Sequence, residues 1–321
     1  MNLLLSGNRF ANLLILIACC GLTFQIEAQQ SQRKPAVSEV RFDSGKSALG
    51  IPFELHNNHI YLRVRVNNSE PLPFILDTGA STIISRTRAE SLGLKFNRKE
   101  QGFGVGENAI EASLAEGVSL NLPGASLVRQ TITAADLEDL QQSLGRTVDG
   151  IFGSSFFSRF VVEIDYAAKT INLYAPESYR YKGKAERVPL IVDADSGLIF
   201  VRAAVKPSKR APIKGLFEVD TGGAHALILN SPFVKRNNFL TAAQKTNSVS
   251  IGGFGSSRAV AGTIESLLLG SSNHIENVNT FFSLATGGML SNAEFDGNIG
   301  NDILRRFKVV FDYSRHSMFL E

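Results

Sequence analysis

Short segments in which apolar and polar residues alternate make up most of this chain. Residues 62–66 and 118–122 alternate with a period of two, and residues 161–174 do so more loosely. Such alternation is typical of strands that bury one face. Turn residues at 123–124 and 270–271 separate these segments. The pattern predicts a mainly β protein.

Helical signals are short and few. Ser85 can cap a helix that ends near Gly93, Ser231 precedes a proline suited to a first helical position, and Asn301 can cap residues 302–306. We therefore expect one or two small helices in each half.

The chain contains an internal repeat. Residues 149–173 and 296–320 share nine identities in 25 positions without a gap, at an offset of 147. Upstream, residues 74–79 match residues 217–222 at an offset of 143, so the second copy has four extra residues in between. Coincidence at that density is improbable, and we interpret the two halves as copies of one unit.

The repeat sets the expected domain boundaries. The first unit spans residues 38–175 and the second spans residues 188–321, each long enough for its own core. Residues 176–187 between them are polar and carry four Lys or Arg residues, which predicts an exposed connector.

Residues 1–28 have the pattern of a signal peptide, with Arg9 in a positive segment and an apolar stretch at residues 11–24. This predicts an exported protein, either periplasmic or secreted. Two cleavage sites compete: after Ala28, or before Cys19 as in a membrane-attached lipoprotein, because residues 16–19 resemble a lipobox. An uncleaved anchor is a third alternative, although this stretch is shorter than the roughly 20 residues that span a bilayer.

Composition excludes several classes of site. The two cysteines, Cys19 and Cys20, lie in the predicted signal peptide. The rest of the chain therefore has no disulfide, thiol nucleophile or cysteine metal ligand. The five histidines form no recognisable metal motif. The 33 basic and 30 acidic residues give a net charge of +3 without a basic run, so nucleic acid is not an expected partner. We expect no metal and no cofactor.

Each half contains an Asp-Thr-Gly triplet after a largely apolar run: Asp77 follows residues 74–76, and Asp220 follows residues 216–219. A strand that ends on Asp and turns through Gly lets backbone N–H groups approach the carboxylate closely. If the copies face each other across a pseudo-twofold axis, the two carboxylates meet and share one proton. One then acts as base on a bound water and the other as acid toward the substrate carbonyl.

Residues 75–81 and 148–153 resemble the active-site segments of the retropepsin and pepsin aspartic peptidases, especially bacterial retropepsin-like members. Both segments recur at residues 219–224 and 295–300, so the resemblance covers nearly the whole chain after the signal peptide. It implies a mainly β, bilobal acid protease fold with two pseudo-twofold-related, β-barrel-like lobes and short helices. In this family the second segment threads the loop of the first to form a ψ-shaped motif, and the two carboxyls are a standard example of a shared proton.

The resemblance also implies roles for individual residues. The expected catalytic residues are Asp77 and Asp220. The expected supporting residues are Thr78, Gly79, Thr221 and Gly222. The two threonines would exchange hydrogen bonds and hold the two turns coplanar.

Each half also has a glycine-rich stretch, at residues 102–106 and 252–255, that resembles the flap hairpin closing over substrate. The residues expected to contact substrate there are Phe103, Gly104, Gly253 and Phe254. A plain hairpin without ligand contact is the alternative interpretation.

Two departures from pepsins bear on pH. Pepsins place a hydroxyl residue directly after the Gly of the triplet, whereas this chain has Ala80 and Gly223. Loss of that hydrogen-bond donor should raise the carboxylate pKa values, so we expect activity nearer to neutral pH than that of pepsin. The flap stretches also lack a tyrosine.

The sequence thus predicts a monomeric aspartic endopeptidase that hydrolyses peptide or protein substrates with a water activated between Asp77 and Asp220. The alternative is a catalytically inactive peptide- or glycan-binding protein on the same scaffold. A surface lipoprotein with a structural role is a third hypothesis, and it depends on processing at Cys19. Contact with a membrane is expected only if Cys19 is lipidated.

Overall fold

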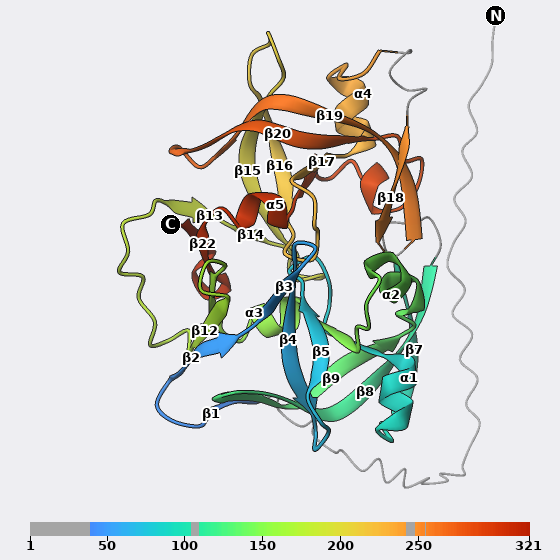
Figure 1. Cartoon of the computed structure of the whole chain (residues 1–321), viewed down its shortest axis with the longest axis vertical. Helices are drawn as coiled ribbons and strands as arrows, with labels where there is room; N and C mark the ends of the chain where they lie inside the picture. The colour runs from blue at the N-terminus through green and yellow to red at the C-terminus, as the bar shows by residue number, and fades with distance from the viewer. Residues whose placement is uncertain (1–38, 104–108, 242–247, 254) are drawn as a thin grey trace, which may run out of the picture. The chain divides into compact units, whose positions relative to one another are not determined.

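The computed structural model of the protein describes residues 39–103, 109–241, 248–253 and 255–321 (Figure 1). Strands dominate these residues, as the alternating pattern predicts. No helix among them is long and apolar enough to cross a membrane.

The first half forms a sheet that closes on itself. Its strands are β1 (Glu39–Phe42), β3 (Glu54–His56), β4 (His59–Val66), β5 (Leu72–Leu76), β6 (Ile83–Ser85), β7 (Phe96–Phe103), β8 (Ala109–Leu122), β9 (Ala125–Ala135) and β10 (Gly150–Phe152). Their order is β1-β9-β6-β10-β5-β4-β8-β7, with β3 beside β4. Because β8 also pairs with β9, the strands from β9 to β8 close a barrel.

The second half repeats this arrangement, except that no described strand there corresponds to β1. Its strands are β14 (Ile191–Val192), β15 (Ile199–Lys206), β16 (Ile213–Val219), β17 (Leu227–Leu229), β18 (Val249–Gly253), β19 (Gly255–Leu269), β20 (Asn273–Ser283) and β21 (Gly297–Ile299). Their order is β14-β15-β16-β21-β17-β20-β19-β18, and pairing of β15 with β19 closes the second barrel. The predicted mainly β fold with two barrel-like lobes is confirmed.

In each half one short strand is inserted between the two strands that flank the Asp-Thr-Gly turn. β10 lies parallel to β5 and antiparallel to β6, and β21 lies in the same way between β16 and β17. Both inserted strands are buried along their whole length; β10 has only apolar residues and glycine, whereas β21 contains the polar Asn298. This is the ψ-shaped threading that the resemblance implies.

A third sheet contains strands from both halves, which the sequence does not predict. Its members are β2 (Ser47–Pro52), β11 (Val161–Asp165), β12 (Thr170–Tyr174), β13 (Arg187–Pro189), β22 (Lys308–Asp312) and β23 (Ser317–Leu320). β11 pairs antiparallel with its own repeat β22 at the centre of this sheet. The loose alternation of residues 161–174 thus covers two strands. Asp165 and Asp312 end β11 and β22, and their carboxylates accept hydrogen bonds from backbone N–H groups of the following turns.

The helices are as short as expected. They are α1 (Arg86–Ser91), α2 (Glu138–Leu144), α3 (Ser154–Phe157), α4 (Ser231–Arg236) and α5 (Asn301–Leu304), with the 3-10 helices η2 (Met289–Ser291) and η3 (Tyr313–Arg315). The expected caps Ser231 and Asn301 are wrong by one residue, because each lies inside its helix. Their side chains bind elsewhere: the Ser231 hydroxyl donates to the Ala285 carbonyl and the Asn301 amide donates to the Asn58 carbonyl.

The hydrophobic core continues from one half into the other. The main cluster of buried residues contains side chains of both barrels and of the shared sheet. At the junction the Phe157 ring packs edge-on against Phe311 and stacks on Tyr313, with ring centroids 5.5 Å and 5.7 Å apart. Side chains from both copies therefore fix the geometry between the two Asp-Thr-Gly turns.

Candidate active site

The two Asp-Thr-Gly turns begin where β5 and β16 end. Asp77 N–H donates to the Phe152 carbonyl at 2.8 Å, and Asp220 N–H donates to the Ile299 carbonyl at 2.9 Å. Each acceptor is the last residue of its inserted strand, β10 or β21, and a glycine follows it. The inserted strand therefore positions the backbone of each Asp, and it does so in the same way in both halves.

The two turns are joined by hydrogen bonds of their threonines. Thr78 N–H donates to the Thr221 hydroxyl oxygen at 3.0 Å, and Thr221 N–H donates to the Thr78 hydroxyl oxygen at 2.9 Å. Each hydroxyl also donates across the junction, Thr78 to the Val219 carbonyl at 2.6 Å and Thr221 to the Leu76 carbonyl at 3.0 Å. Both threonines are fully buried. The structure thus contains the exchange that the resemblance implies, and it fixes one turn against the other.

The glycines of the triplets bring the carboxyl groups together. A Cβ atom on Gly222 would overlap the Asp77 carboxyl group, and a Cβ on Gly79 would lie 3.1 Å from Asp220 Oδ1. Each turn therefore lies against the aspartate of the other turn, and a side chain at Gly222 would displace the Asp77 carboxyl group. Gly79 N–H donates to Asp77 Oδ1 and Gly222 N–H donates to Asp220 Oδ1, both at 2.7 Å.

The environment favours a proton on this pair. Burial raises the pKa of Asp77 well above the ordinary aspartate value, and the charge of Asp220 raises it further, while the Gly79 N–H acts in the opposite direction. Two carboxyls this close cannot both ionise without a large energetic cost, so one proton is held between them. This is the condition needed for one group to act as acid and the other as base.

Three polar residues beside Asp220 were missed by the sequence reasoning. Asn298 Nδ2 donates to Asp220 Oδ2 at 2.9 Å and to Glu218 Oε2 at 3.0 Å, and Asn298 Oδ1 lies 2.7 Å from His225 Nε2. Glu218 is only 3% exposed. The available signal was a glutamate in the apolar run before the second Asp-Thr-Gly, since the matching position of the first half is Ile75.

In the second half, the structure explains why a glycine, Gly223, follows the Asp-Thr-Gly triplet. A Cβ atom on Gly223 would overlap the His225 ring and would lie 2.8 Å from Asp220 Oδ2. In pepsins a hydroxyl at this position donates a hydrogen bond to the aspartate. Here the Asn298 amide and the Gly223 N–H donate to Asp220 instead, and the Gly223 nitrogen is 3.0 Å from Asp220 Oδ1. The expectation that Asp220 loses a donor is therefore wrong, whereas Ala80 supplies no hydroxyl to Asp77.

The described parts of the glycine-rich stretches, residues 102–103 and 252–253, end two strands that correspond to each other, β7 and β18. β7 pairs with β8 up to Phe103, and β18 pairs with β19 up to Gly253. Gly104 and Phe254 lie outside the described residues. The hairpin prediction agrees with these pairings, and contact with substrate stays a prediction.

The aspartates of the inserted segments, Asp149 and Asp296, bind groups of their own half. Asp296 Oδ2 accepts from Leu216 N–H at 2.8 Å, and the Asp149 carboxylate accepts from the Arg88 guanidinium, with Nε 2.9 Å from Oδ1. Asp296 also pairs with Arg236. Each half thus has an arginine of its short helix, α1 or α4, bound to the inserted segment, which stabilises the turn without touching the reacting groups.

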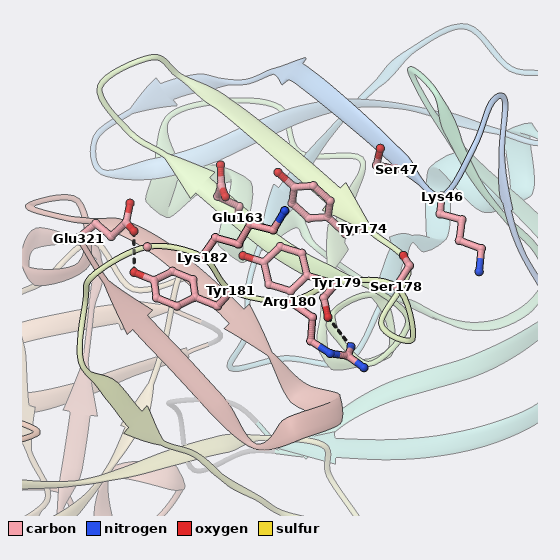
Figure 2. A pocket seen from close by; sticks show the side chains of 11 residues that line it. Lys46, Ser47, Glu163, Tyr174, Ser178, Tyr179, Arg180, Tyr181, Lys182 and Glu321 are labelled. Atoms are coloured by element: carbon pink, nitrogen blue, oxygen red, sulfur yellow. Dashed lines mark hydrogen bonds between the residues drawn. The ribbon is translucent and has the colours of Figure 1, made fainter.

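A separate pocket of about 430 Å³ lies on the shared sheet (Figure 2). Residues 178–183 of the connector line one side of it. Tyr181 fixes the connector there, because its hydroxyl donates to Glu321 Oε1 at 2.6 Å and its ring stacks on Phe319 with centroids 3.8 Å apart. No residue that lines the pocket belongs to either Asp-Thr-Gly turn. It is therefore not part of the candidate active site.

Paired barrels, inserted ψ strands and facing Asp-Thr-Gly turns define the class of retropepsin-like and pepsin-like acid proteases. Comparison with family models agrees: residues 62–156 match the family model Asp_protease_2, described as aspartyl protease. This stretch, which contains Asp77 and the inserted strand β10, is thus similar to the aspartyl protease family. No curated protein matches the chain at a significant level. Among the described residues no group of three or more His, Cys, Asp or Glu side chains could hold a metal ion.

Proposed function

We propose that this protein is an aspartic endopeptidase that hydrolyses peptide bonds with a water molecule activated between Asp77 and Asp220. The observation that carries the proposal is the convergence of the two aspartates, held by the reciprocal Thr78 and Thr221 hydrogen bonds. The raised pKa of Asp77 supports a shared proton between the two carboxyls.

The proposed reaction uses the two carboxyl groups in opposite states. The ionised aspartate accepts a proton from water as the oxygen attacks the peptide carbonyl carbon. The protonated aspartate donates a hydrogen bond to the carbonyl oxygen, which stabilises the negative charge that develops there. The substrate would lie as an extended segment beside the β7–β8 and β18–β19 hairpins, because extended peptides bind by adding a strand-like segment.

The experiment is cleavage of a diverse peptide library by the protein and by Asp77→Asn and Asp220→Asn, from acidic to mildly alkaline pH. Both substitutions should reduce kcat by about three orders of magnitude or more, because each removes a group needed in the transition state. Asp195→Asn is a matched control, since Asp195 is exposed. Cleavage that survives both active-site substitutions would refute the mechanism. Peptide binding without cleavage by the parent would favour the binding-protein alternative.

We also propose that the protein acts as an exported monomer on peptide or protein substrates. The proposal rests on the signal-peptide pattern of residues 1–28 and on the presence of both aspartates in one chain. The mass of the mature protein tests it, because cleavage after Ala28 and lipidation at Cys19 give different products. A chain that keeps residues 1–28 would contradict cleavage and favour the uncleaved anchor.

A further inference from the structure

The second half carries a buried carboxyl group that the two-aspartate mechanism does not use. Glu218 on β16 pairs across to Asn298 on β21, in the register where Ile75 pairs with Ile151 in the first half. An apolar pair of one copy is thus replaced by a polar pair in the other, next to a catalytic aspartate. Buried polar groups destabilise a protein unless they are hydrogen-bonded, so this replacement calls for a function.

The Asn298 side chain connects this carboxyl to the active site. Its amide nitrogen donates one hydrogen to Glu218 and the other to Asp220, and its oxygen faces His225 Nε2. In this orientation His225 must donate from Nε2, since the amide oxygen can only accept.

Among the residues that the structure describes, no positive charge compensates an ionised Glu218. Glu218 interacts with Asp77, Asp220 and Tyr313, and the histidines of the site, His225 and His59, interact with Asp220. Burial lowers the pKa of both histidines, which favours their neutral forms. Among the described residues no lysine or arginine forms an ion pair with Glu218. A buried carboxyl without a cation is expected to hold its proton.

The pKa of Glu218 agrees with this expectation. Burial and then the charge of Asp220 raise it to about 8, while the hydrogen bond from Asn298 opposes the rise. Glu218 Oε1 and Asp220 Oδ1 also face the same glycine, since a Cβ atom on Gly79 would lie 3.1 Å from each. Three carboxyl groups therefore meet at this junction.

We propose that Glu218 is a positioning residue that keeps a proton beside the catalytic pair, orients Asp220 through the Asn298 amide, and sets the alkaline limit of activity. The proposal rests on the proposed peptidase function. Glu218 does not react with substrate. It acts by its charge state and through the amide that it shares with Asp220.

The sign of its effect on the pH profile follows from electrostatics. Activity is lost at alkaline pH when the last proton leaves the pair formed by Asp77 and Asp220. When Glu218 also ionises, its negative charge holds that proton more tightly, so an ionisable Glu218 can only move the alkaline limb upward. A neutral residue of the same shape removes this effect. At acidic pH Glu218 is protonated, and its replacement by glutamine changes little.

The first test is the pH dependence of kcat/KM for Glu218→Gln, with the exposed Glu294→Gln as matched control. Glu218→Gln should keep the parent's acidic limb and move the alkaline limb about one pH unit lower, which is roughly a tenfold loss at alkaline pH. Glu218→Met, which is also uncharged and of similar size, repeats the test if the glutamine variant does not fold. An alkaline limb that stays in place in a folded variant overturns the proposal.

The positioning role has its own test in Asn298→Leu, with Ile151→Leu as the control at the matching position. Loss of the amide should lower kcat about tenfold or more with a smaller change in KM, because a hydrogen bond to a charged group is lost. An unchanged kcat would refute the positioning role.

A measurement without substrate separates this proposal from the proposed function. At pH 7 the intensity of the infrared C=O band of protonated carboxyl groups should be larger in the parent than in Glu218→Gln, by the intensity of one carboxyl group. This difference should vanish as the pH rises past 8. If the parent cleaves no peptide but shows this difference, the peptidase proposal fails and the protonated Glu218 stands. If the band does not differ, the proton is not on Glu218 and the proposal is wrong.

Discussion

Replacing Glu218 by glutamine should change how the stability of the protein depends on pH. In the folded protein the pKa of Glu218 lies at about 8, against an ordinary value of 4.5. A carboxyl whose pKa is raised on folding contributes its full stability below pH 4.5 and loses it as the pH rises to 8, because the folded state binds a proton that the unfolded state has released. One pKa unit corresponds to about 1.4 kcal/mol, so this group costs about 3 kcal/mol at pH 7 relative to pH 4.5. Glutamine has no such cost.

The assay is urea unfolding of the parent, Glu218→Gln and the control Glu294→Gln at several pH values between 4.5 and 8. The free energy of unfolding of Glu218→Gln minus that of the parent should become more positive by about 3 kcal/mol from pH 4.5 to pH 7. Between pH 4.5 and pH 7 Glu218 is mostly protonated in the folded parent and adds little charge beside Asp77, so the contribution of Asp77 cancels in the difference to a first approximation. The control should follow the parent at every pH. A difference that is constant with pH would mean that Glu218 is ionised in the folded protein and would refute the reasoning.

Two further predictions concern the junction of the turns. Thr78→Val should lower the free energy of unfolding, measured in urea, by about 3 kcal/mol. The substitution leaves the Val219 carbonyl and the buried Thr221 N–H without hydrogen-bond partners. Thr78→Ser keeps both hydrogen bonds and should cost less than half as much. Equal losses in both variants would contradict this. Gly223→Ser should destabilise the protein by about 2 kcal/mol and lower kcat/KM, because the Cβ atom of the serine would overlap the His225 ring. This is expected even though pepsins carry a hydroxyl residue at this position. Ala80→Ser, at a residue that already has a Cβ, is the control, and a gain in activity for Gly223→Ser would refute the explanation.

Much of the fold can be predicted from the sequence because the two halves of the chain are copies of one unit. The repeat predicts which strands correspond, and the barrels agree strand for strand, including the insertion of β10 and β21. The pairing of β11 with β22 could not be predicted in this way. Alternation shows that a strand buries one face, but it does not identify the partner when the partner lies in the other copy. The repeated Asp165 and Asp312 mark the ends of both strands without indicating that the strands meet.

The same limit applies to the site. The triplets identify Asp77 and Asp220 because a strand end, a threonine and a glycine are local features. The environment of Asp220 depends on Asn298, 78 residues further along the chain, and on the inserted strand that carries it. Glu218 interrupts an apolar run in the sequence, yet its role becomes visible only when β16 and β21 are paired.

The differences between the two halves suggest how a duplicated chain can divide two roles between equivalent aspartates. In a symmetric pair of identical subunits, any substitution beside one aspartate also appears beside the other, so a glutamate there would add two buried carboxyls. A single chain can place Glu218 and Asn298 on one side and keep Ile75 and Ile151 on the other. Asp220 then accepts hydrogen bonds from two backbone N–H groups and an amide. Asp77 accepts one from Gly79, and burial raises its pKa. On this reasoning Asp77 carries the shared proton.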